Sequence, residues 1–320
     1  MAIVGGGPAG LSCAKELDNS GLKILLIEKN KIIGPKVCAG GITLKDLTEI
    51  PKEILDAVFK KIFVRYKNKS VLVERSHDLI ATIDREKLGQ YQLGLLNNTK
   101  VLTGTSVAKI NNNFLSLDSG KQINFKFLVG ADGSNSLVRN YLQLSTKKIL
   151  VGFQYILPRQ LENFELYLEE GANYLWIFPR KNCTSVGGSM DSRKKFELWL
   201  EKNKIDLTGA KFEAGVINYD YRGYRFGNIF LAGDAAGLAS GLTGEGIYPA
   251  IISGKQIARE ILGNNSGENL IEEWLAKKRK QEKYLFFLRR SDYFKHLFFS
   301  LLMKLIENKK MQEKIIDLVT

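Results

Sequence analysis

The residues best suited to chemistry are three glycines and one acid near the start of the chain. Gly5, Gly7 and Gly10 follow the G-x-G-x-x-G spacing, and Glu28 comes about 18 residues after the last of them. In this pattern the first glycine permits a tight turn, the second lets the backbone approach a pyrophosphate, and the third lets a helix pack on a strand. The phosphates then lie at the positive end of that helix. The pattern therefore predicts a dinucleotide site.

The elements that must position these residues follow from the flanking sequence. Residues 2–4 form a short apolar run, residues 11–17 fit a helix, and residues 22–27 form a second apolar run that ends at Glu28. A dinucleotide-binding βαβ unit has this same order of strand, glycine turn, helix, strand and acid. A carboxylate at this place accepts hydrogen bonds from ribose hydroxyls and disfavours a 2′-phosphate, so we expect FAD or NAD. Neighbouring residues expected to contact the same nucleotide are Pro8, Ala9 and Lys29.

Two later motifs favour FAD. Asp132 and Asp234 each follow an apolar strand beside a glycine, and a glycine-rich segment over 241–247 precedes a helix predicted over 248–262. With these motifs in this order, the chain resembles the FAD-dependent family that includes p-hydroxybenzoate hydroxylase, squalene epoxidase and the geranylgeranyl reductases. The resemblance covers residues 1 to about 262, which is most of the chain.

The resemblance implies specific cofactor contacts. Asp234 would bind the ribityl chain of FAD, and Gly246 and Ile247 would lie against the isoalloxazine ring. A helix that starts after Gly246 aims its N–H groups at the flavin edge where negative charge collects on reduction. Arg85 matches the family arginine that contacts the cofactor; the alternative is an ordinary surface residue at the start of a helix. Val107 matches the residue whose backbone contacts adenine in the family. The other motif residues expected at the cofactor are Asp132, Gly133, Gly233 and Gly244.

Three segments narrow the resemblance to the geranylgeranyl reductases. Residues 35–42, PKVCAGGI, resemble the proline, cysteine and glycine segment of that branch, with alanine where a glycine is usual. Residues 173–180 resemble its Y-x-W-x-F-P-K strand, with arginine in place of the final lysine. The GEGI motif at 244–247 fits the reductases better than the hydroxylases, which tend to end it in asparagine. The resemblance implies an FAD-dependent oxidoreductase that reduces C=C double bonds of an isoprenoid, geranylgeranyl-type lipid.

Cys38 admits three interpretations. Small cysteines are commonly packing residues. The glycines beside it let the backbone approach a ring closely, which fits a flavin contact by Cys38, Ala39 and Gly40. The thiol could also donate a proton to the substrate. Glu245 is a second candidate for the proton donor. The alternative is that Glu245 is only a surface-exposed or helix-capping acid.

An aromatic row is expected to face the substrate. Tyr174, Trp176 and Phe178 alternate along the chain, so on a strand they share one face. This face is either ordinary sheet core or the wall of an apolar channel over the flavin. Aromatic side chains offer a polyprenyl chain a large apolar area without acting as bases.

The C-terminal part carries over half of the net charge of +13. Residues 276–320 contain 12 Lys and Arg against 5 Asp and Glu, together with many phenylalanines. One face of a helix is predicted to carry Phe287, Phe294, Phe298, Leu301 and Leu305. Such a helix either packs on the body with its lysines in water or lies on an anionic membrane surface. Its aromatic residues are clumped with aliphatic ones, which disfavours nucleic acid as a partner.

The predicted fold class is α/β: a Rossmann-like FAD-binding domain of the p-hydroxybenzoate hydroxylase type, an inserted, mostly antiparallel β-sheet substrate domain and a helical C-terminal tail. The expected boundaries are 1–60, 80–140 and 215–265 for the FAD domain, 60–80 and 140–215 for the sheet domain, and 266–320 for the basic amphipathic tail.

Composition excludes several other classes. Three cysteines rule out a disulfide scaffold, and two histidines leave little for a zinc site, so we expect no metal. No apolar stretch approaches the roughly 18–20 residues that span a bilayer. Strand-like residues begin at Ala2, so no signal peptide is visible. We expect a cytoplasmic protein, either free or peripheral on the inner face of the cell membrane.

Two alternative functions stay open on the sequence. One is a flavin-dependent monooxygenase acting on an aromatic or polyene substrate. The other is a membrane-associated electron-transfer flavoprotein that binds lipid without transforming it. The residues do not identify the electron donor among NAD(P)H, ferredoxin or another reductant, because hydroxylases of this family also lack a second nucleotide fold.

Overall fold

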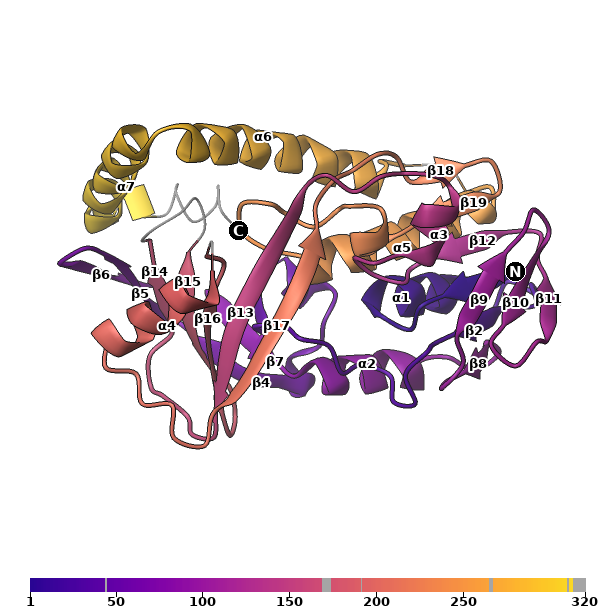
Figure 1. Ribbon diagram of the computed structural model, residues 1–320, viewed down its shortest axis with the longest axis horizontal. Helices are drawn as coiled ribbons and strands as arrows, with labels where there is room; N and C mark the ends of the chain where they lie inside the picture. The colour runs from indigo at the N-terminus through magenta and orange to yellow at the C-terminus, as the bar shows by residue number, and fades with distance from the viewer. Residues whose placement is uncertain (44, 169–173, 191, 265–266, 310, 313–320) are drawn as a thin grey trace. The chain divides into compact units, whose positions relative to one another are not determined.

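The chain forms two compact units, each assembled from three segments (Figure 1). The computed structural model describes residues 1–43, 45–168, 174–190, 192–264, 267–309 and 311–312. The first unit comprises Met1–Lys36, Arg85–Leu150 and Ile217–Lys280, and the second comprises Val37–Asp84, Val151–Val216 and Gln281–Thr320. This division differs from the expected domains, because residues 37–60 and the residues after Lys280 join the sheet-rich unit.

A six-stranded sheet forms the centre of the first unit, in the order β18-β19-β12-β1-β2-β8. Its strands are β1 (Ala2–Val4), β2 (Leu25–Ile27), β8 (Lys100–Leu102), β12 (Leu128–Gly130), β18 (Arg225–Phe226) and β19 (Ile229–Leu231). All neighbours pair in parallel except β18 and β19. The inner strands β1, β12 and β19 are buried along their whole length, as is typical of parallel strands.

Helices and a small second sheet complete this unit. They are α1 (Pro8–Leu17), α2 (Arg85–Gly94), α3 (Leu137–Tyr141), α5 (Ile247–Ile261), the 3-10 turn η3 (Gly233–Ala235), and the sheet β9 (Val107–Ile110), β10 (Phe114–Leu117) and β11 (Gln122–Asn124). The predicted helices over 11–17 and 248–262 correspond to α1 and α5. These two helices cross so closely at Gly254 that a Cβ there would lie 2.2 Å from the carbonyl oxygen of Ala9.

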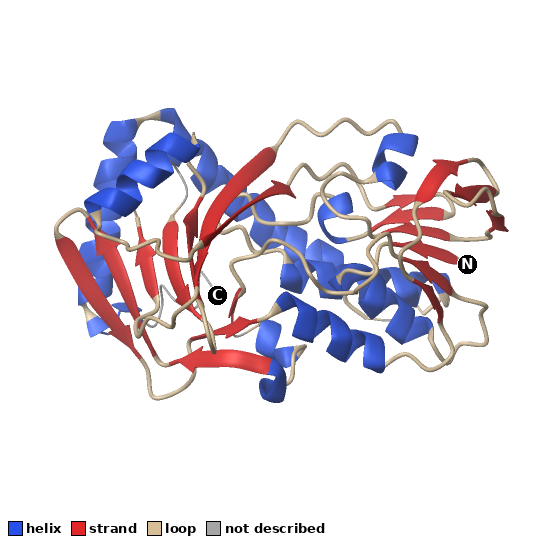
Figure 2. Cartoon of the chain, turned by 60° about the horizontal axis from the view of Figure 1, so that its bottom comes forward, coloured by secondary structure: helices blue, strands red, loops and turns tan. Residues whose placement is uncertain are grey.

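A seven-stranded sheet dominates the second unit, in the order β17-β13-β16-β15-β14-β5-β6 (Figure 2). Its strands are β5 (Lys61–Tyr66), β6 (Lys69–Glu74), β13 (Ile149–Leu157), β14 (Glu165–Tyr167), β15 (Leu175–Pro179), β16 (Thr184–Gly188) and β17 (Lys211–Asn218). The pairs β13–β16, β16–β15, β15–β14 and β5–β6 are antiparallel, whereas β14 and β5 are parallel. This sheet confirms the mostly antiparallel architecture.

Smaller elements surround the seven-stranded sheet. They are a three-stranded sheet of β3 (Gly41–Thr43), β7 (Ile80–Ile83) and β4 (Leu55–Phe59), the 3-10 turns η1 (Asp46–Thr48) and η2 (Lys52–Ile54), and the helix α4 (Arg193–Lys202). Helix α4 buries Phe196 and Trp199 in an apolar cluster with Tyr155 and Tyr167 of the sheet.

The C-terminal segment folds into two helices, α6 (Leu270–Arg290) and α7 (Asp292–Glu307). Ser291 separates them, and its side chain accepts a hydrogen bond from the N–H of Phe294 as the N-cap of α7. The prediction that Phe287 shares one helical face with Phe294, Phe298, Leu301 and Leu305 is therefore wrong, since the helix is interrupted at Ser291. Helix α7 packs on the second unit, where the hydroxyl of Tyr66 lies 2.5 Å from Nδ1 of His296.

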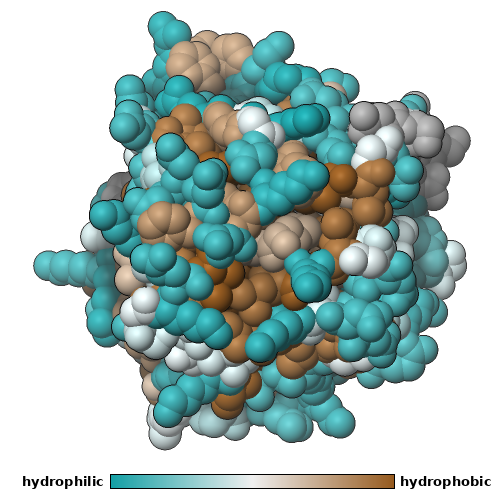
Figure 3. Space-filling model, turned by 90° about the vertical axis from the view of Figure 1, so that its right-hand side faces the viewer, coloured by the Kyte–Doolittle hydropathy of each residue, from teal (hydrophilic) through white to brown (hydrophobic). Residues whose placement is uncertain are grey.

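No helix within the described residues is both long enough and apolar enough to cross a membrane. Figure 3 draws one end of the molecule, where hydrophobic side chains show in patches bordered by hydrophilic ones.

Candidate functional site

The three motifs of the first unit follow neighbouring parallel strands. The register aligns the last residues of β1, β12 and β19, so the loops that follow these strands start side by side. Gly5 opens the loop after β1, Ala131 and Asp132 open the loop after β12, and Gly233 lies in the loop after β19. Ligands of open parallel sheets bind at this carboxyl edge. The structure thus brings together motifs that lie more than 200 residues apart.

Each glycine of the first motif has a different environment. Gly5 has φ +107°, and a Cβ there would lie 2.2 Å from the carbonyl oxygen of Ala131. A Cβ on Gly10 would lie 2.0 Å from the carbonyl oxygen of Gly5. A Cβ on Gly7, in contrast, would meet nothing within 4 Å. The backbone is therefore open at the N-terminus of α1, which begins at Pro8, and the N–H groups there fit an anionic group.

The Glu28 carboxylate lies beside this turn. Its Oε2 accepts a hydrogen bond from the N–H of Gly6 at 2.7 Å, and its Oε1 accepts one from the N–H of Asn30 at 2.8 Å. A carboxylate has about four acceptor positions, so both oxygens keep capacity for ribose hydroxyls. The N–H of Thr105 donates to the carbonyl of Glu28 at 3.0 Å, which brings the start of β9 with Val107 to the same region. Lys29 is exposed next to it.

The Asp132 carboxylate serves the fold. It accepts hydrogen bonds from the hydroxyl of Ser136 at 2.5 Å and from the N–H of Leu137 at 2.7 Å, at the start of α3. Burial raises the pKa of Asp132, although these hydrogen bonds act in the opposite direction. Contacts from this motif to a ligand would therefore come from its backbone. The adjacent Gly133 has φ +79° and open space where a Cβ would be.

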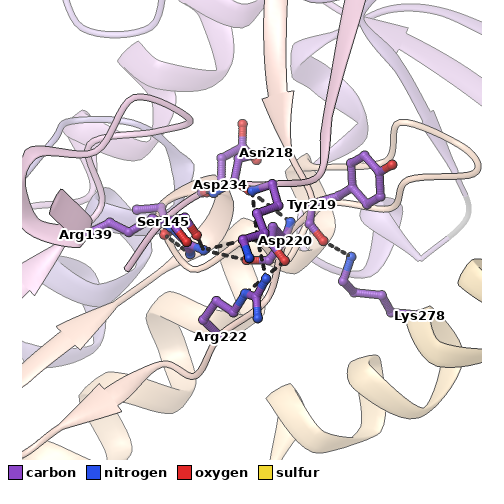
Figure 4. A network of polar contacts seen from close by, with 10 residues as sticks. Arg139, Ser145, Asn218, Tyr219, Asp220, Arg222, Asp234 and Lys278 are labelled. Atoms are coloured by element: carbon purple, nitrogen blue, oxygen red, sulfur yellow. Dashed lines mark hydrogen bonds and ion pairs between the residues drawn. The ribbon is translucent and has the colours of Figure 1, made fainter. Parts of the chain in front are cut away.

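Asp234 lies in a polar network that Figure 4 shows. Its Oδ2 accepts hydrogen bonds from Nζ of Lys36 at 2.9 Å and from the hydroxyl of Ser134 at 3.1 Å. The side-chain amide of Asn218 donates to its carbonyl at 2.8 Å. Sequence reasoning missed Lys36 and Asn218, because no local pattern connects them to the Gly-Asp motif.

A buried arginine holds the loops around this network (Figure 4). Arg139, 1% exposed, donates to the carbonyls of Ala235, Ser145 and Asp220 at 3.2, 3.3 and 2.8 Å. Burial lowers the pKa of Arg139, and the nearby carboxylate of Asp220 opposes that shift. The arginine that follows the Asp-Gly motif therefore acts as a structural clamp.

The N-terminus of α5 adjoins Asp234. Gly246 is the N-cap of this 15-residue helix, Ile247 is its first residue, and a Cβ on Gly246 would lie 3.5 Å from Oδ1 of Asp234. Gly244 precedes them with φ +69°. The Glu245 carboxylate is largely buried and lies 3.7 Å from Nζ of Lys277 on α6. The structure thus pairs this predicted acid with a cation.

Helix α6 supports the loop that leads into α5. The indole N–H of Trp274 donates to the carbonyl of Leu238 at 2.7 Å. The buried ammonium of Lys278 donates to the carbonyl of Ala239 at 2.7 Å. It also donates to the carbonyl of Tyr219 at 2.9 Å (Figure 4). These three bonds satisfy backbone carbonyl oxygens of the loops beside the site.

Arg85 is the first residue of α2 and is 8% exposed. Its Nε has no hydrogen-bond partner among the described residues. A buried guanidinium N–H costs free energy when it is unpaired, so this group fits an acceptor from a ligand. The interpretation of Arg85 as an ordinary surface residue does not agree with its burial.

The cysteine segment belongs to the second unit. Cys38 and Ala39 are half-buried, and the N–H of Gly40 lies 3.4 Å from Sγ of Cys38. Gly40 has φ +79°, and a Cβ there would lie 2.8 Å from Nη2 of Arg180. A Cβ on Gly41 would lie 2.6 Å from the ring of Phe178. The glycines therefore let this segment approach side chains of its own unit closely.

The predicted aromatic row is also in the second unit. The rings of Tyr174 and Trp176 have centroids 6.1 Å apart, and those of Trp176 and Phe178 are 5.8 Å apart. Phe178 is buried and stacks on Phe164 at 4.1 Å, whereas Tyr174 and Trp176 are half-buried. The three side chains share one face, as their alternation predicts, and its exposure decreases from Tyr174 and Trp176 to Phe178.

Comparison with known proteins gives the family context. A family model described as Thi4 family matches residues 1–111. A chloroplastic geranylgeranyl diphosphate reductase from Nicotiana tabacum is 29% identical over 323 residues, which cover 85% of this chain and 68% of that protein. A digeranylgeranylglycerophospholipid reductase from Methanococcus vannielii is 28% identical over 335 residues, which cover 89% of this chain and 83% of that protein.

Solved structures confirm the fold. A geranylgeranyl bacteriochlorophyll reductase-like protein from Thermoplasma acidophilum matches with a TM-score of 0.78 at 21% identity, over 96% of this chain and 91% of that one. A probable FAD-dependent monooxygenase from Pseudomonas aeruginosa matches with a TM-score of 0.68 at 16% identity, over 99% and 98%. The predicted fold class, a Rossmann-like unit joined to an antiparallel sheet, is that of both proteins.

Proposed function

Since the chain is a homologue of the geranylgeranyl reductases and an FAD-dependent oxidoreductase, we propose that it reduces carbon–carbon double bonds of a geranylgeranyl-type isoprenoid lipid. The observation that carries the proposal is the extent of the similarity. Relatives named as geranylgeranyl reductases match at least 85% of the chain, so the match includes segments of both units.

The first unit supports a defined mode of FAD binding. We propose that the N-terminus of α1 binds the pyrophosphate, Glu28 the adenosine ribose, and Asp234 the ribityl chain, with the N-terminus of α5 against the isoalloxazine ring. The open space at Gly7 and the unpaired Nε of Arg85 support this assignment. The Lys36 ammonium, whose side chain is 47% exposed, would move off Asp234 or share it with the ribityl hydroxyls.

The second unit supports binding of an apolar chain. FAD, when bound and reduced, supplies the hydride for the double bond. The chain's own residues position the alkene and keep water out, and we assign that part to the row of Tyr174, Trp176 and Phe178. Cys38 is the favoured proton donor, because it is half-buried beside Gly40. Glu245 is less suited, because it is paired with Lys277.

We also propose that the last two helices meet an anionic membrane surface, where isoprenoid lipids are found. Among the described residues, exposed large hydrophobic side chains concentrate in this part of the chain. This aromatic patch consists of Tyr284, Phe286, Phe287, Tyr293, Phe294, Leu297, Phe298 and Leu301. The rings of Tyr284 and Phe298 lie 6.5 Å apart, which joins the end of α6 to α7 (Figure 1). Arg289 and Arg290 are the last two residues of α6, so in the sequence they lie between the patch residues of α6 and those of α7. Positive charge beside exposed aromatic residues favours binding to an anionic leaflet.

A single anaerobic experiment tests the reductase function. The protein is denatured to release its flavin, which is identified by mass, and a second sample is photoreduced and mixed with geranylgeranyl diphosphate or digeranylgeranylglycerophospholipid. We expect FAD, and a lipid product that gains two hydrogens for each double bond reduced. A product that gains an oxygen atom under air would identify a monooxygenase instead. Flavin reoxidation with unchanged lipid mass, with NAD(P)H or ferredoxin as donor, would identify an electron-transfer protein.

A further inference from the structure

A buried polar network in the second unit links the cysteine segment to the aromatic row. Nη2 of Arg180 donates to the carbonyl of Cys38 at 2.6 Å, and Nε2 of Gln154 lies 3.4 Å from the same oxygen. Oε1 of Gln154 accepts from the hydroxyl of Ser185 at 3.0 Å. That hydroxyl oxygen in turn accepts from the indole N–H of Trp176 at 2.9 Å. One chain of hydrogen bonds therefore joins a peptide of the cysteine segment to the indole.

The network is shielded from water. Ser185, Gln154 and Arg180 are 0%, 2% and 8% exposed. Hydrogen bonds in such surroundings are stronger than in water, and an unpaired group is correspondingly costly. The carboxylate of Asp84 lies 3.9 Å from Nη1 of Arg180, and Glu213 accepts a hydrogen bond from Nε2 of Gln154 at 2.9 Å. The geometry is thus held from several directions.

The cysteine segment fits against Arg180 in one orientation. A Cβ on Gly40 would lie 2.6 Å from the carbonyl of Ile83 and 2.8 Å from Arg180, so only glycine allows this approach. The N–H of Ile83 donates to the carbonyl of Gly40 at 2.9 Å, which fixes the far side of the segment. Because the peptide is trans and planar, the N–H of Ala39 points away from Arg180.

We propose that Arg180, together with Gln154, is a positioning residue that holds the Cys38–Ala39 peptide and the Trp176 indole in one mutual geometry. The proposal rests on the proposed function, in which Cys38 donates the proton and the aromatic row binds the lipid. In this proposal Arg180 acts through these two groups. Without the guanidinium, the Cys38 carbonyl loses its charged donor and keeps only the longer contact to Nε2 of Gln154, so the peptide plane is held less firmly.

Three variants separate positioning from fold stability. Arg180→Met removes the donors and keeps an unbranched side chain, Arg180→Lys restores a charged donor, and Gln154→Met breaks the link to Ser185 without a change in charge. The first readout is the rate at which iodoacetamide alkylates Cys38, followed by the mass of the Cys38 peptide, which needs neither flavin nor lipid. The second is the separation of kcat from KM for lipid reduction.

We expect Arg180→Met and Gln154→Met to change the Cys38 alkylation rate and to lower kcat by about tenfold or more, with a smaller effect on KM. Arg180→Lys should recover most of both properties. Arg65→Met is the matched control, because Arg65 lies in the same sheet and pairs with Glu165 at 2.6 Å. It should lower the thermal unfolding temperature without changing Cys38 alkylation or kcat.

The proposal would be overturned if a folded Arg180→Met variant had the same Cys38 alkylation rate and the same kcat as the wild type. If that variant does not fold, the same result in Gln154→Met is decisive. A wild-type protein that binds FAD but leaves the lipid unchanged would defeat the proposed function alone. In that case an unchanged Cys38 alkylation rate in the variants would still overturn the positioning role, and a changed rate would support it.

Discussion

At the residue scale, nucleotide binding depends most directly on Glu28. Its two carboxylate oxygens are oriented by the N–H groups of Gly6 and Asn30, so the side chain is already placed before a ribose arrives. Glu28→Ala removes an acceptor for charge-assisted hydrogen bonds, each of which contributes on the order of 1.5–3 kcal/mol. We expect FAD affinity to fall by at least tenfold, measured from flavin fluorescence during titration of the apoprotein.

Glu28→Gln is the control for this prediction. The amide oxygen of the glutamine can still accept from one backbone N–H, so the turn keeps its shape while the charge is lost. We expect its affinity to lie between those of the wild type and Glu28→Ala. Equal FAD affinity in all three proteins would count against the assigned ribose contact.

At the element scale, the crossing of α1 and α5 determines whether their N-termini are placed correctly. A Cβ on Gly254 would lie 2.2 Å from the carbonyl of Ala9 and 2.9 Å from the N of Cys13. Gly254→Ala therefore forces the helices apart, at a cost of roughly 1–3 kcal/mol for overpacking. This exceeds the helix propensity that alanine gains over glycine, which is at most about 1 kcal/mol. We expect a lower free energy of unfolding in urea and weaker FAD binding.

Gly94→Ala is the matched control for the helix crossing. Gly94 ends α2, and a Cβ there would meet nothing within 4 Å. The same substitution should therefore leave the free energy of unfolding unchanged or raise it slightly. If both variants unfold at the same urea concentration as the wild type, the close approach of α1 and α5 is not needed.

The C-terminal segment shows how a local signal interrupts a longer pattern. Hydrophobic spacing alone predicts one helical face that includes Phe287 and Phe294. Ser291 caps a new helix between them, and α7 instead buries Phe299, Met303 and Ile306. The exposed aromatic patch therefore comes from two helix surfaces.

At the scale of the whole molecule, the aromatic patch and its arginines predict salt-sensitive binding to anionic liposomes. Each Lys or Arg near an anionic leaflet contributes about 1 kcal/mol, and salt screens this attraction. Arg289→Glu combined with Arg290→Glu should lower liposome binding by tenfold or more. The variant loses the attraction of two arginines, about 1 kcal/mol each, and its two new carboxylates are repelled by the anionic lipid. Co-sedimentation at low and high salt measures the effect.

A control with the same change in charge makes this prediction specific. Lys100→Glu combined with Lys121→Glu alters exposed residues of the first unit, away from α6 and α7 in the sequence. This variant should bind liposomes nearly as well as the wild type, and both variants should keep their flavin. If the wild type does not bind anionic liposomes at low salt, the proposed membrane contact is wrong.

Sequence alone determined the features that depend on short-range geometry. The glycine spacing, the acid after the second strand and the helices predicted over 11–17 and 248–262, which match α1 and α5, follow from turn chemistry and periodicity within a few tens of residues. The alternation of Tyr174, Trp176 and Phe178 placed them on one face for the same reason. These local signals, with the family resemblance, were sufficient for the fold class and for FAD.

Tertiary structure alone decided which distant residues meet. Lys36 pairs with Asp234 across 198 positions, and Arg180 reaches the carbonyl of Cys38 across 142 positions. It also showed that the Asp132 carboxylate is engaged at the start of α3 and that the residues after Lys280 join the second unit. Such contacts depend on which strands pair and which helices cross, and a pairing between distant segments leaves no period in the sequence of either one.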